Sequence, residues 1–190
     1  MGCCESTKDT PKDEKKMANS EFIRNDISIA QALKSLCKIY TQDTISSGFL
    51  IQFFKDQEKL FCLMTNEHVI TKTMVARKEK FTFYFDNESE TREILLDPKE
   101  RYIKDFRYLN IDAIVIEILP KDNIPQYFFL KPNIDYINNE DILINKEITI
   151  LQYPDGNSYR AFGTIISKKK NNEFAHSAST LPGSSGSPIF

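Results

Sequence analysis

The sequence predicts an all-β fold, and three of its features support that prediction. Short apolar runs rich in β-branched and aromatic residues recur along the chain, as they do in strands. Turn-forming residues separate them, with Pro154-Asp155-Gly156-Asn157 as the clearest case. Few windows show the 3.6-residue period of an amphipathic helix. Many short strands with few helices favour a β-barrel or a β-sandwich, and we find no internal repeat.

The elements can be assigned in chain order. Residues 5–21 are polar and contain proline, which predicts a disordered tether. A short amphipathic helix is expected next, because Ile27, Ile29, Ala30, Leu33 and Leu36 follow a helical period. The strands predicted beyond it are 36–40, 49–54, 60–64, 81–85, 91–96, 113–119, 127–130, 147–153, 159–167 and 174–178, with a further strand opening at 187–190. A polar connection at 97–109 and a linker at 120–125 separate some of these strands.

Composition excludes several classes of protein. A chain of 190 residues makes one ordinary domain or two small ones. Its 41% hydrophobic and 27% charged residues allow a packed core and argue against global disorder. The net charge of −2 gives no indication of nucleic-acid binding, and the basic run 168–170 predicts a solvated hairpin tip. We find neither a transmembrane segment nor a secretory signal.

The four cysteines are Cys3, Cys4, Cys37 and Cys62. They form no paired framework across the body of the chain, which favours a reducing, intracellular setting. Cys37 and Cys62 have apolar neighbours and are predicted to be buried, inert thiols.

The first six residues, Met1-Gly2-Cys3-Cys4-Glu5-Ser6, fit the pattern for N-myristoylation of Gly2. Cys3 and Cys4 are candidate palmitoylation sites. One myristoyl chain holds a membrane only marginally, so a second acyl chain would make the attachment stable. We therefore expect a lipid-anchored protein on the cytoplasmic face of a membrane. An undecorated flexible tail, which would leave the protein cytosolic, is the alternative.

Ser185 lies in a glycine-flanked turn near the end of the chain. Gly183 and Gly186 let the backbone bend sharply and bring N–H groups close to a ligand. A nucleophilic serine with a backbone oxyanion hole needs this arrangement. An ordinary surface loop is the alternative, because serine, glycine and proline dominate turns.

Two further residues supply the partners that a nucleophilic serine requires. His68 follows an apolar run, and Asp112 opens another. A serine hydroxyl needs a base to take its proton, and the imidazole needs a carboxylate to orient it. Taken singly, His68 also fits a packed histidine and Asp112 a cap at the start of a strand. The second histidine, His176, fits a partly exposed strand residue or a substrate contact.

Four segments together resemble the trypsin-like, chymotrypsin-fold serine peptidases. They are Ser47-Gly48-Phe49, residues 63–70 around His68, residues 111–116 around Asp112, and Gly183-Ser184-Ser185-Gly186-Ser187-Pro188. Their order is that of the family, and 44 residues separate His68 from Asp112 while 73 separate Asp112 from Ser185. The resemblance covers roughly residues 36–190.

The resemblance implies two six-stranded antiparallel β-barrels with the site in the cleft between them. By it, His68 is the general base, Asp112 orients it and Ser185 is the nucleophile. The backbone N–H groups of Gly183 and Ser185 would form the oxyanion hole. The reaction would be hydrolysis of a peptide or protein substrate through an acyl-enzyme, with no metal or cofactor.

The chain also departs from the family. Ser184 occupies the position where many members carry an aspartate that pairs with a new N-terminus, so we expect no such activation. Ser179 falls at the floor of the family's specificity pocket, with Thr180 beside it as a second pocket candidate. Both are uncharged, which argues against a preference for arginine or lysine. The family continues beyond the position of Phe190, so we expect an incomplete second barrel and a fragment of a longer protein.

The predicted organisation has three parts. Residues 1–26 form the lipid-anchor tail, residues 27–122 the helix and first barrel, and residues 123–190 the incomplete second barrel with Ser185. A serine endopeptidase is the function that this organisation favours. A non-catalytic, protease-like module that binds peptides or proteins at a membrane is the alternative, and the sequence leaves the oligomeric state open.

Overall fold

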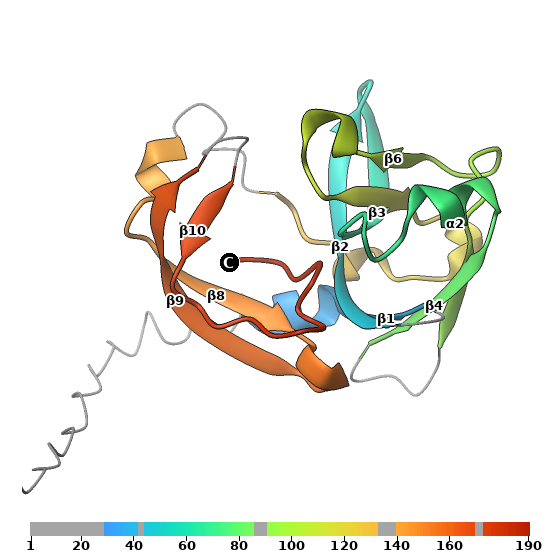
Figure 1. Cartoon of the computed structure of the whole chain (residues 1–190). Helices are drawn as coiled ribbons and strands as arrows, with labels where there is room; N and C mark the ends of the chain where they lie inside the picture. The colour runs from blue at the N-terminus through green and yellow to red at the C-terminus, as the bar shows by residue number, and fades with distance from the viewer. Residues whose placement is uncertain (1–28, 42–43, 86–90, 133–139, 170–172) are drawn as a thin grey trace, which may run out of the picture.

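A computed structural model describes residues 29–41, 44–85, 91–132, 140–169 and 173–190. It contains two antiparallel β-sheets that lie side by side, one of seven strands and one of three (Figure 1). The end of the chain lies between them. The all-β prediction is therefore confirmed.

The first sheet comprises the first seven strands of the chain. They are β1 (Leu36–Tyr40), β2 (Ile45–Lys55), β3 (Glu58–Thr65), β4 (Lys80–Tyr84), β5 (Arg92–Leu95), β6 (Ile103–Asp105) and β7 (Ile114–Glu117). Their order in the sheet is β5-β4-β1-β2-β3-β7-β6. The two edge strands follow each other in sequence, so residues 96–102 join the edges and the sheet curls on itself (Figure 1).

The inward faces of these strands and the segments that follow them build the main hydrophobic core, a cluster of sixteen buried residues. In β4, alternate residues are buried, as expected for a strand with one face toward the core. Burial of each large side chain, such as Leu63 or Phe83, contributes about 1.5–3 kcal/mol. This core supports the ends of β3 and β7, next to which His68 and Asp112 lie.

The second sheet contains β8 (Glu147–Gln152), β9 (Tyr159–Lys168) and β10 (Phe174–His176), in the order β10-β9-β8. Its core cluster has only five buried residues, including Ile150 and Ile165. The end of the chain pairs with β8, because Thr149 and Phe190 exchange backbone hydrogen bonds of 2.8 and 2.9 Å. The strand predicted at 187–190 is thus reduced to one antiparallel bridge, Ile150 with Ile189.

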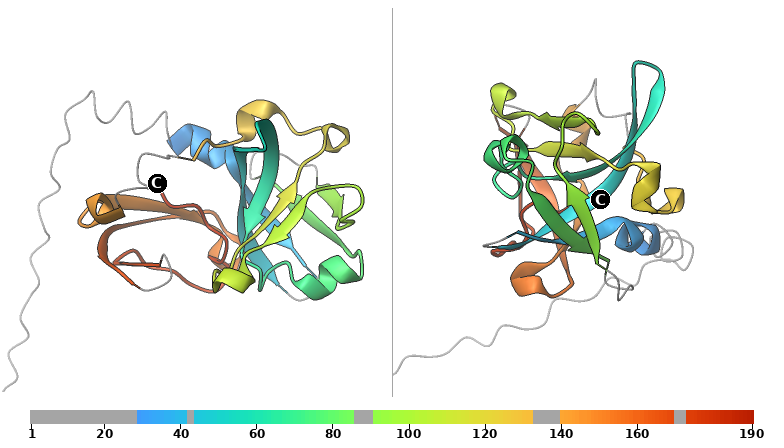
Figure 2. Two further views of the ribbon diagram at one scale, coloured as in Figure 1. Left: turned by 90° about the horizontal axis from the view of Figure 1, so that it is seen from above. Right: turned by 90° about the vertical axis from the view of Figure 1, so that its right-hand side faces the viewer.

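A helix over residues 29–35 lies at the junction of the two sheets, as the sequence predicts for this region (Figures 1 and 2). Ala32 and Leu36 pack in one buried cluster with Leu151 and Tyr153. The helix therefore connects β1 of the first sheet with β8 of the second. None of the helices in the described ranges is long and apolar enough to cross a membrane.

The strand predicted at residues 127–130 is wrong. Gln126–Phe128 form the 3-10 helix η3, which begins after Pro125. The apolar side chains of Phe128 and Phe129 pack into the core of the first sheet, and they are not part of a strand ladder. Leu130 makes only a parallel bridge with Ile51.

The region around β5 and β6 also differs from the prediction. Residues 97–109 were expected as a polar connection, but β6 pairs there with β7. The family resemblance implied six strands per barrel, whereas this sheet has seven. The turn after Asp97, whose carbonyl accepts the N–H groups of Glu100 and Arg101, separates β5 from β6.

Short helical elements complete the fold. Within the part of the chain that the structure describes, the one α-helix beyond residues 29–35 is α2 (Lys72–Ala76), which the sequence did not predict. The remaining 3-10 helices in the described ranges are η1 (Arg107–Leu109), η2 (Pro120–Asp122), η4 (Glu140–Leu143) and η5 (Pro154–Gly156). The last of these confirms the turn predicted at 154–157. The tail, residues 1–26, lies outside the described residues, and so does the tip of the predicted basic hairpin at 170–172.

Cys37 and Cys62 are buried and free, as the sequence predicts. Burial raises the pKa of both thiols, and that of Cys62 rises to about 12, with a smaller contribution from the charge of Glu117. Both thiols therefore remain protonated and unreactive at neutral pH.

Candidate active site

His68 lies in a loop that the first core holds in place. β3 ends at Thr65, and the carbonyl of Asn66 then accepts the N–H groups of Val69 and Ile70 at 3.1 and 3.3 Å. Val69 and Ile70 are both buried in the main core. His68 itself keeps half of its side chain exposed, so the loop is fixed while the imidazole stays accessible.

Asp112 lies at the tip of a tight turn between η1 and β7. Asn110 ends η1 with a left-handed φ of 59°, a conformation that asparagine tolerates better than most residues. The N–H of Ala113 then donates to the carbonyl of Ile111 at 3.0 Å, which directs the chain sharply around Asp112. The turn places this carboxylate beside the His68 loop.

Asp112 and His68 make two contacts. The carboxylate accepts the backbone N–H of His68 at 3.0 Å, and its second oxygen lies 2.5 Å from Nδ1 of the imidazole. The side-chain amide of Asn66 donates to the backbone carbonyl of Asp112 at 2.5 Å. The imidazole and the carboxylate are therefore held together by both side chain and backbone.

The surroundings of Asp112 favour its ionised form. Partial burial opposes ionisation of the carboxyl group, but hydrogen bonds from the side chain and backbone of His68, the charge of His68 and the backbone N–H of Glu67 outweigh it. The pKa of Asp112 consequently lies below its usual value. An ionised carboxylate accepts the proton on Nδ1, which leaves Nε2 of His68 as the basic nitrogen.

The turn around Ser185 depends on its two glycines. Gly183 and Gly186 have φ values of 95° and 83°, a region that residues with a side chain rarely adopt. A Cβ on Gly183 would lie 2.5 Å from the carbonyl oxygen of Tyr153, and one on Gly186 would lie 2.1 Å from that of Ser47. The chain therefore packs too closely here for any other residue.

Ser184 and Leu181 close the loop before the nucleophile candidate. The N–H of Ser184 donates to the carbonyl of Leu181 at 3.0 Å, and its hydroxyl accepts the N–H of Leu181 at the same distance. The loop is closed by a local pair of hydrogen bonds.

Ser47 of the first sheet connects to this turn at several points. Its N–H donates to the carbonyl of Ser185 at 2.9 Å, and its hydroxyl donates to that of Gly183 at 2.8 Å. The same hydroxyl accepts the N–H of Tyr153 at 2.9 Å, and the Thr65 hydroxyl donates to the Ser47 carbonyl at 2.8 Å. Ser47 is fully buried, so its bonds to Tyr153, Gly183 and Ser185 connect the first sheet to the second half of the chain without competition from water.

The N–H groups of Gly183 and Ser185 are the predicted oxyanion hole. Within the described part of the chain, neither donates a hydrogen bond to another protein group. Donors left free beside a serine hydroxyl can stabilise an oxyanion that forms there. The geometry agrees with the assignment, which remains a prediction.

A cavity of about 470 Å³ lies between the two sheets and is bordered by both. The first sheet and its loops contribute Met64, Asn66 and Asp112, and the second half contributes His176 and Ser185. His68 reaches this site through its contact with Asp112. No hydrogen bond joins His68 to Ser185 among the described residues.

Comparison with known families identifies the domain. A family model described as a trypsin-like peptidase domain matches residues 46–190. The chain belongs to this family. No curated protein sequence matches it significantly.

Solved structures of serine proteases share the fold of this peptidase domain. A serine endoprotease from Yersinia pestis is 17% identical with a TM-score of 0.59, over 86% of this chain and 52% of that one. Deg5 is 16% identical with a TM-score of 0.61, over 91% and 81% of the two chains. The inactive form of the Rv3671c protease of M. tuberculosis is 19% identical with a TM-score of 0.56, over 88% and 77%. This chain spans about half the length of the Yersinia protein.

The structure separates the two predicted residues of the substrate pocket. Thr180 lines the Ser185 cavity, and so does His176. Ser179 instead lines a different cavity of about 350 Å³ beside Tyr159 and Arg160, and its carbonyl accepts the side-chain amide of Gln152 at 3.2 Å. Thr180 and His176 are therefore better placed than Ser179 to meet a substrate side chain.

Sequence reasoning missed two residues of the peptidase site. Ser47 was part of a matching motif, but its sequence neighbours gave no sign that it bonds to the Ser185 turn. Glu67 is almost completely buried directly before His68, and no local pattern distinguishes it from a solvent-exposed acid. The described residues include no group of three or more His, Cys, Asp or Glu that could hold a metal ion.

Proposed function

We propose that this chain is a serine endopeptidase in which Ser185, His68 and Asp112 form the catalytic triad. The observation that carries the proposal is the two-point contact between Asp112 and His68 beside the cavity that Ser185 lines. Family membership supports the same chemistry.

In this mechanism, Nε2 of His68 takes the proton of the Ser185 hydroxyl as the oxygen attacks a peptide carbonyl. Asp112 stabilises the imidazolium that results, because its carboxylate is ionised and hydrogen-bonded to Nδ1. His68 then gives the proton to the leaving amine, and an acyl-enzyme on Ser185 remains. Water hydrolyses this ester by the reverse sequence of proton transfers.

The tetrahedral intermediate carries a negative oxygen that needs donors. The free N–H groups of Gly183 and Ser185 serve this role in the proposal. Loss of one such donor costs about 10²–10³-fold in kcat in comparable enzymes. The hydrogen bonds of Ser47 to the carbonyls of Gly183 and Ser185 hold this part of the backbone in place before substrate arrives.

Covalent labelling with a fluorophosphonate probe tests the triad. The wild-type chain is expected to react, and Ser185→Ala to lose the label completely. His68→Ala is expected to react at least about 10³-fold more slowly, because no base remains to activate the hydroxyl. Ser167→Ala, at an exposed serine on β9, is the matched control and should label normally. Label that survives in Ser185→Ala would refute the assignment.

A peptide library distinguishes the enzyme from the protease-like binding module. Sequence-selective cleavage that disappears in Ser185→Ala supports the endopeptidase. Binding without turnover, unchanged in Ser185→Ala, would support the module. The uncharged Thr180 and the partly buried His176 lead us to expect selectivity for residues other than arginine and lysine at the cleaved bond.

The proposal includes attachment to the cytoplasmic face of a membrane through Gly2, Cys3 and Cys4. Its support is the sequence pattern alone, since these residues lie outside the described part of the chain. In cells that carry out N-myristoylation, Gly2→Ala should move the protein from the membrane to the soluble fraction. Substitution of both cysteines by serine should weaken attachment without abolishing acylation of Gly2. A membrane fraction unchanged in Gly2→Ala would contradict this part of the proposal.

A further inference from the structure

Glu67 immediately precedes His68, and its side chain points into the protein. The residue is 3% exposed, which is rare for a carboxylate unless it is paired. One oxygen accepts the backbone N–H of Lys72 at 3.1 Å, and the other forms an ion pair with Nη2 of Arg107. Burial of the carboxylate therefore depends on a partner from a different loop.

Arg107 belongs to the loop that carries Asp112. It begins η1, and its backbone carbonyl accepts the N–H of Asn110 at 2.9 Å, two residues before Asp112. The ion pair thus joins the histidine-bearing loop to the aspartate-bearing loop. Because Glu67 immediately precedes His68, whose backbone N–H donates to the carboxylate of Asp112, displacement of Glu67 would disturb that contact.

We propose that Glu67 is a positioning residue, which through Arg107 holds the His68 loop at the distance where Asp112 and Nδ1 of His68 form their hydrogen bond. This inference rests on the proposed function of these residues. A buried ion pair fixes the relative position of its two loops more strictly than a surface ion pair does, because separating it would leave a buried charge unpaired, which is energetically costly.

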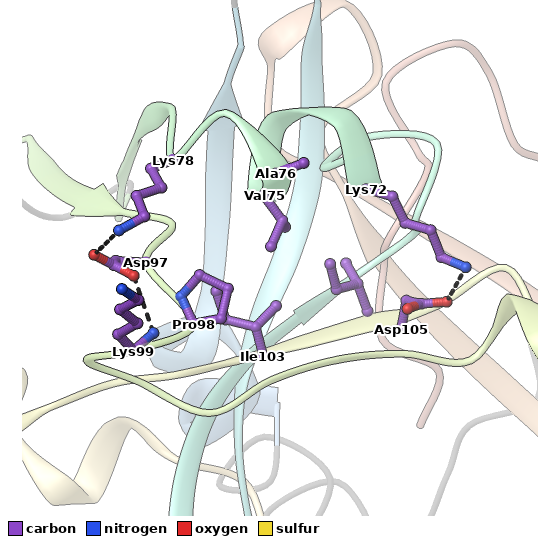
Figure 3. Close-up of a pocket in the computed structure, with 10 residues that line it drawn as sticks. Lys72, Val75, Ala76, Lys78, Asp97, Pro98, Lys99, Ile103 and Asp105 are labelled. Carbon is purple, nitrogen blue, oxygen red and sulfur yellow. Dashed lines mark hydrogen bonds and ion pairs between the residues drawn. The ribbon is translucent and has the colours of Figure 1, made fainter.

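A second ion pair joins α2 to β6, the elements next to these two loops, and provides a control. Nζ of Lys72 lies 3.1 Å from Asp105, with side chains 58% and 26% exposed. Figure 3 shows this pair at one side of a cavity of about 380 Å³, and none of the residues lining that cavity lines the Ser185 cavity. An exposed pair contributes little, so Lys72→Gln removes a link of the same kind with little expected effect.

The experiment compares Glu67→Gln, Arg107→Gln and the control Lys72→Gln in the full chain. We expect kcat to fall about 10–100-fold in the first two, with KM changed less than about 2-fold, because misplacement of a catalytic group by about 1 Å costs up to 10²-fold. The double variant should be little worse than either single variant, since both remove one interaction. Lys72→Gln should stay within about 2-fold of the wild type.

Because Glu67 and Arg107 carry opposite charges, their two variants distinguish a positioning role from a direct electrostatic effect on His68. Asp112 contacts His68 directly, and Lys72 and Asp105 form the ion pair next to these loops. If Glu67 acted only through the electrostatic effect of its charge on His68, Glu67→Gln would remove a negative charge and Arg107→Gln a positive one. The two variants would then change kcat in opposite directions. Positioning predicts a fall in both. Opposite changes, or an unchanged kcat in both, would overturn the inference.

Proton NMR of the hydrogen-bonded Nδ1 proton of His68 gives a readout that does not depend on activity. The signal should be present in the wild type and in Lys72→Gln, and broadened or lost in Glu67→Gln and Arg107→Gln. Glu67→Gln removes the buried charge and keeps the size of the side chain, so it should fold even if Arg107→Gln, which leaves that carboxylate unpaired, does not. An unchanged signal in either folded variant would refute the inference. By contrast, activity that survives in Ser185→Ala would refute the proposed function and leave the NMR result standing.

Discussion

The two halves of the site are held in different ways. His68 and Asp112 are joined mainly through side chains, namely their own contact, the Asn66 amide and the buried Glu67. The Ser185 turn is joined mainly through backbone groups, with two glycines packed against the carbonyls of Ser47 and Tyr153. The contact between His68 and Asp112 therefore depends on which side chains are present. The Ser185 turn depends on the absence of side chains at its two glycines.

The sheets behind these two regions differ as well. The first sheet has a core of sixteen buried residues, and the second has five. Phe162 and Ile166 on β9 remain 69% and 56% exposed. We infer that the second sheet opens at a lower free energy than the first, and that the bonds of Ser47 to Gly183 and Ser185 make the turn depend on the better-packed half.

Gly186→Ala should have the largest effect, because it breaks the backbone arrangement directly. The new Cβ would lie 2.1 Å from the Ser47 carbonyl oxygen and 2.3 Å from the Thr65 hydroxyl. We expect a loss of about 2–4 kcal/mol in the free energy of unfolding and no measurable fluorophosphonate labelling. The matched control is Gly156→Ala, at a φ of 78° but with the nearest atom at 3.4 Å. It should cost only about 1–2 kcal/mol from backbone strain. Equal losses in the two variants would show that close packing is unimportant.

Ser47→Ala should have the next largest effect. It leaves the carbonyl of Gly183 and the N–H of Tyr153 without their side-chain partner, but keeps the backbone bond to Ser185. A buried group left unsatisfied costs about 1–3 kcal/mol, so urea unfolding should show a loss in that range. The labelling rate should fall too, because the turn loses one of its two links to Ser47. Ser47→Thr retains a hydroxyl and should restore part of both quantities, and a Thr variant no better than Ala would argue against the hydrogen bonds.

Asp112→Asn tests the side-chain region through pH. The folded-state pKa of Asp112 is lowered, so its contribution to stability is present above the unfolded value of about 3.9 and is lost as pH falls through the folded value. The stability difference between wild type and Asp112→Asn should therefore shrink as pH drops from 7 to 3. Because 45% of the side chain is exposed, solvent screening keeps this difference small. A difference that does not vary with pH would contradict the lowered pKa.

Thiol labelling should show the smallest effect and concerns the packing of the first sheet. Cys37 and Cys62 are buried, and their pKa values are raised by burial. Iodoacetamide at neutral pH should modify neither in the folded protein and both in urea, as mass spectrometry of tryptic peptides can measure. Modification of Cys62 in the native state would show that the core of the first sheet opens under native conditions.

The sequence predicted most strands because apolar alternation marks some of them, as in β4, and a continuous apolar run marks others, as in β7. It missed β6, whose residues Ile103–Asp105 lie within a polar segment and pair only because β7 is adjacent. It assigned a strand to residues 127–130 because burial of Phe128 and Phe129 resembles a strand when the partner surface is unknown. In each case the deciding contact is distant along the chain.

The sequence by itself determined the fold class and the residues from which a triad could be built, because glycine turns, strand ends and motif order are local properties. Only the tertiary structure brought Asp112 to His68 and connected Ser47 to the Ser185 turn, across 44 and 138 positions of sequence. It alone separated Ser179 from Thr180, which are neighbours in the chain but border different cavities. The sequence specifies which side chain stands at each position. The contacts that give that side chain its role come from segments that are distant in the sequence and pack against it only in the folded protein.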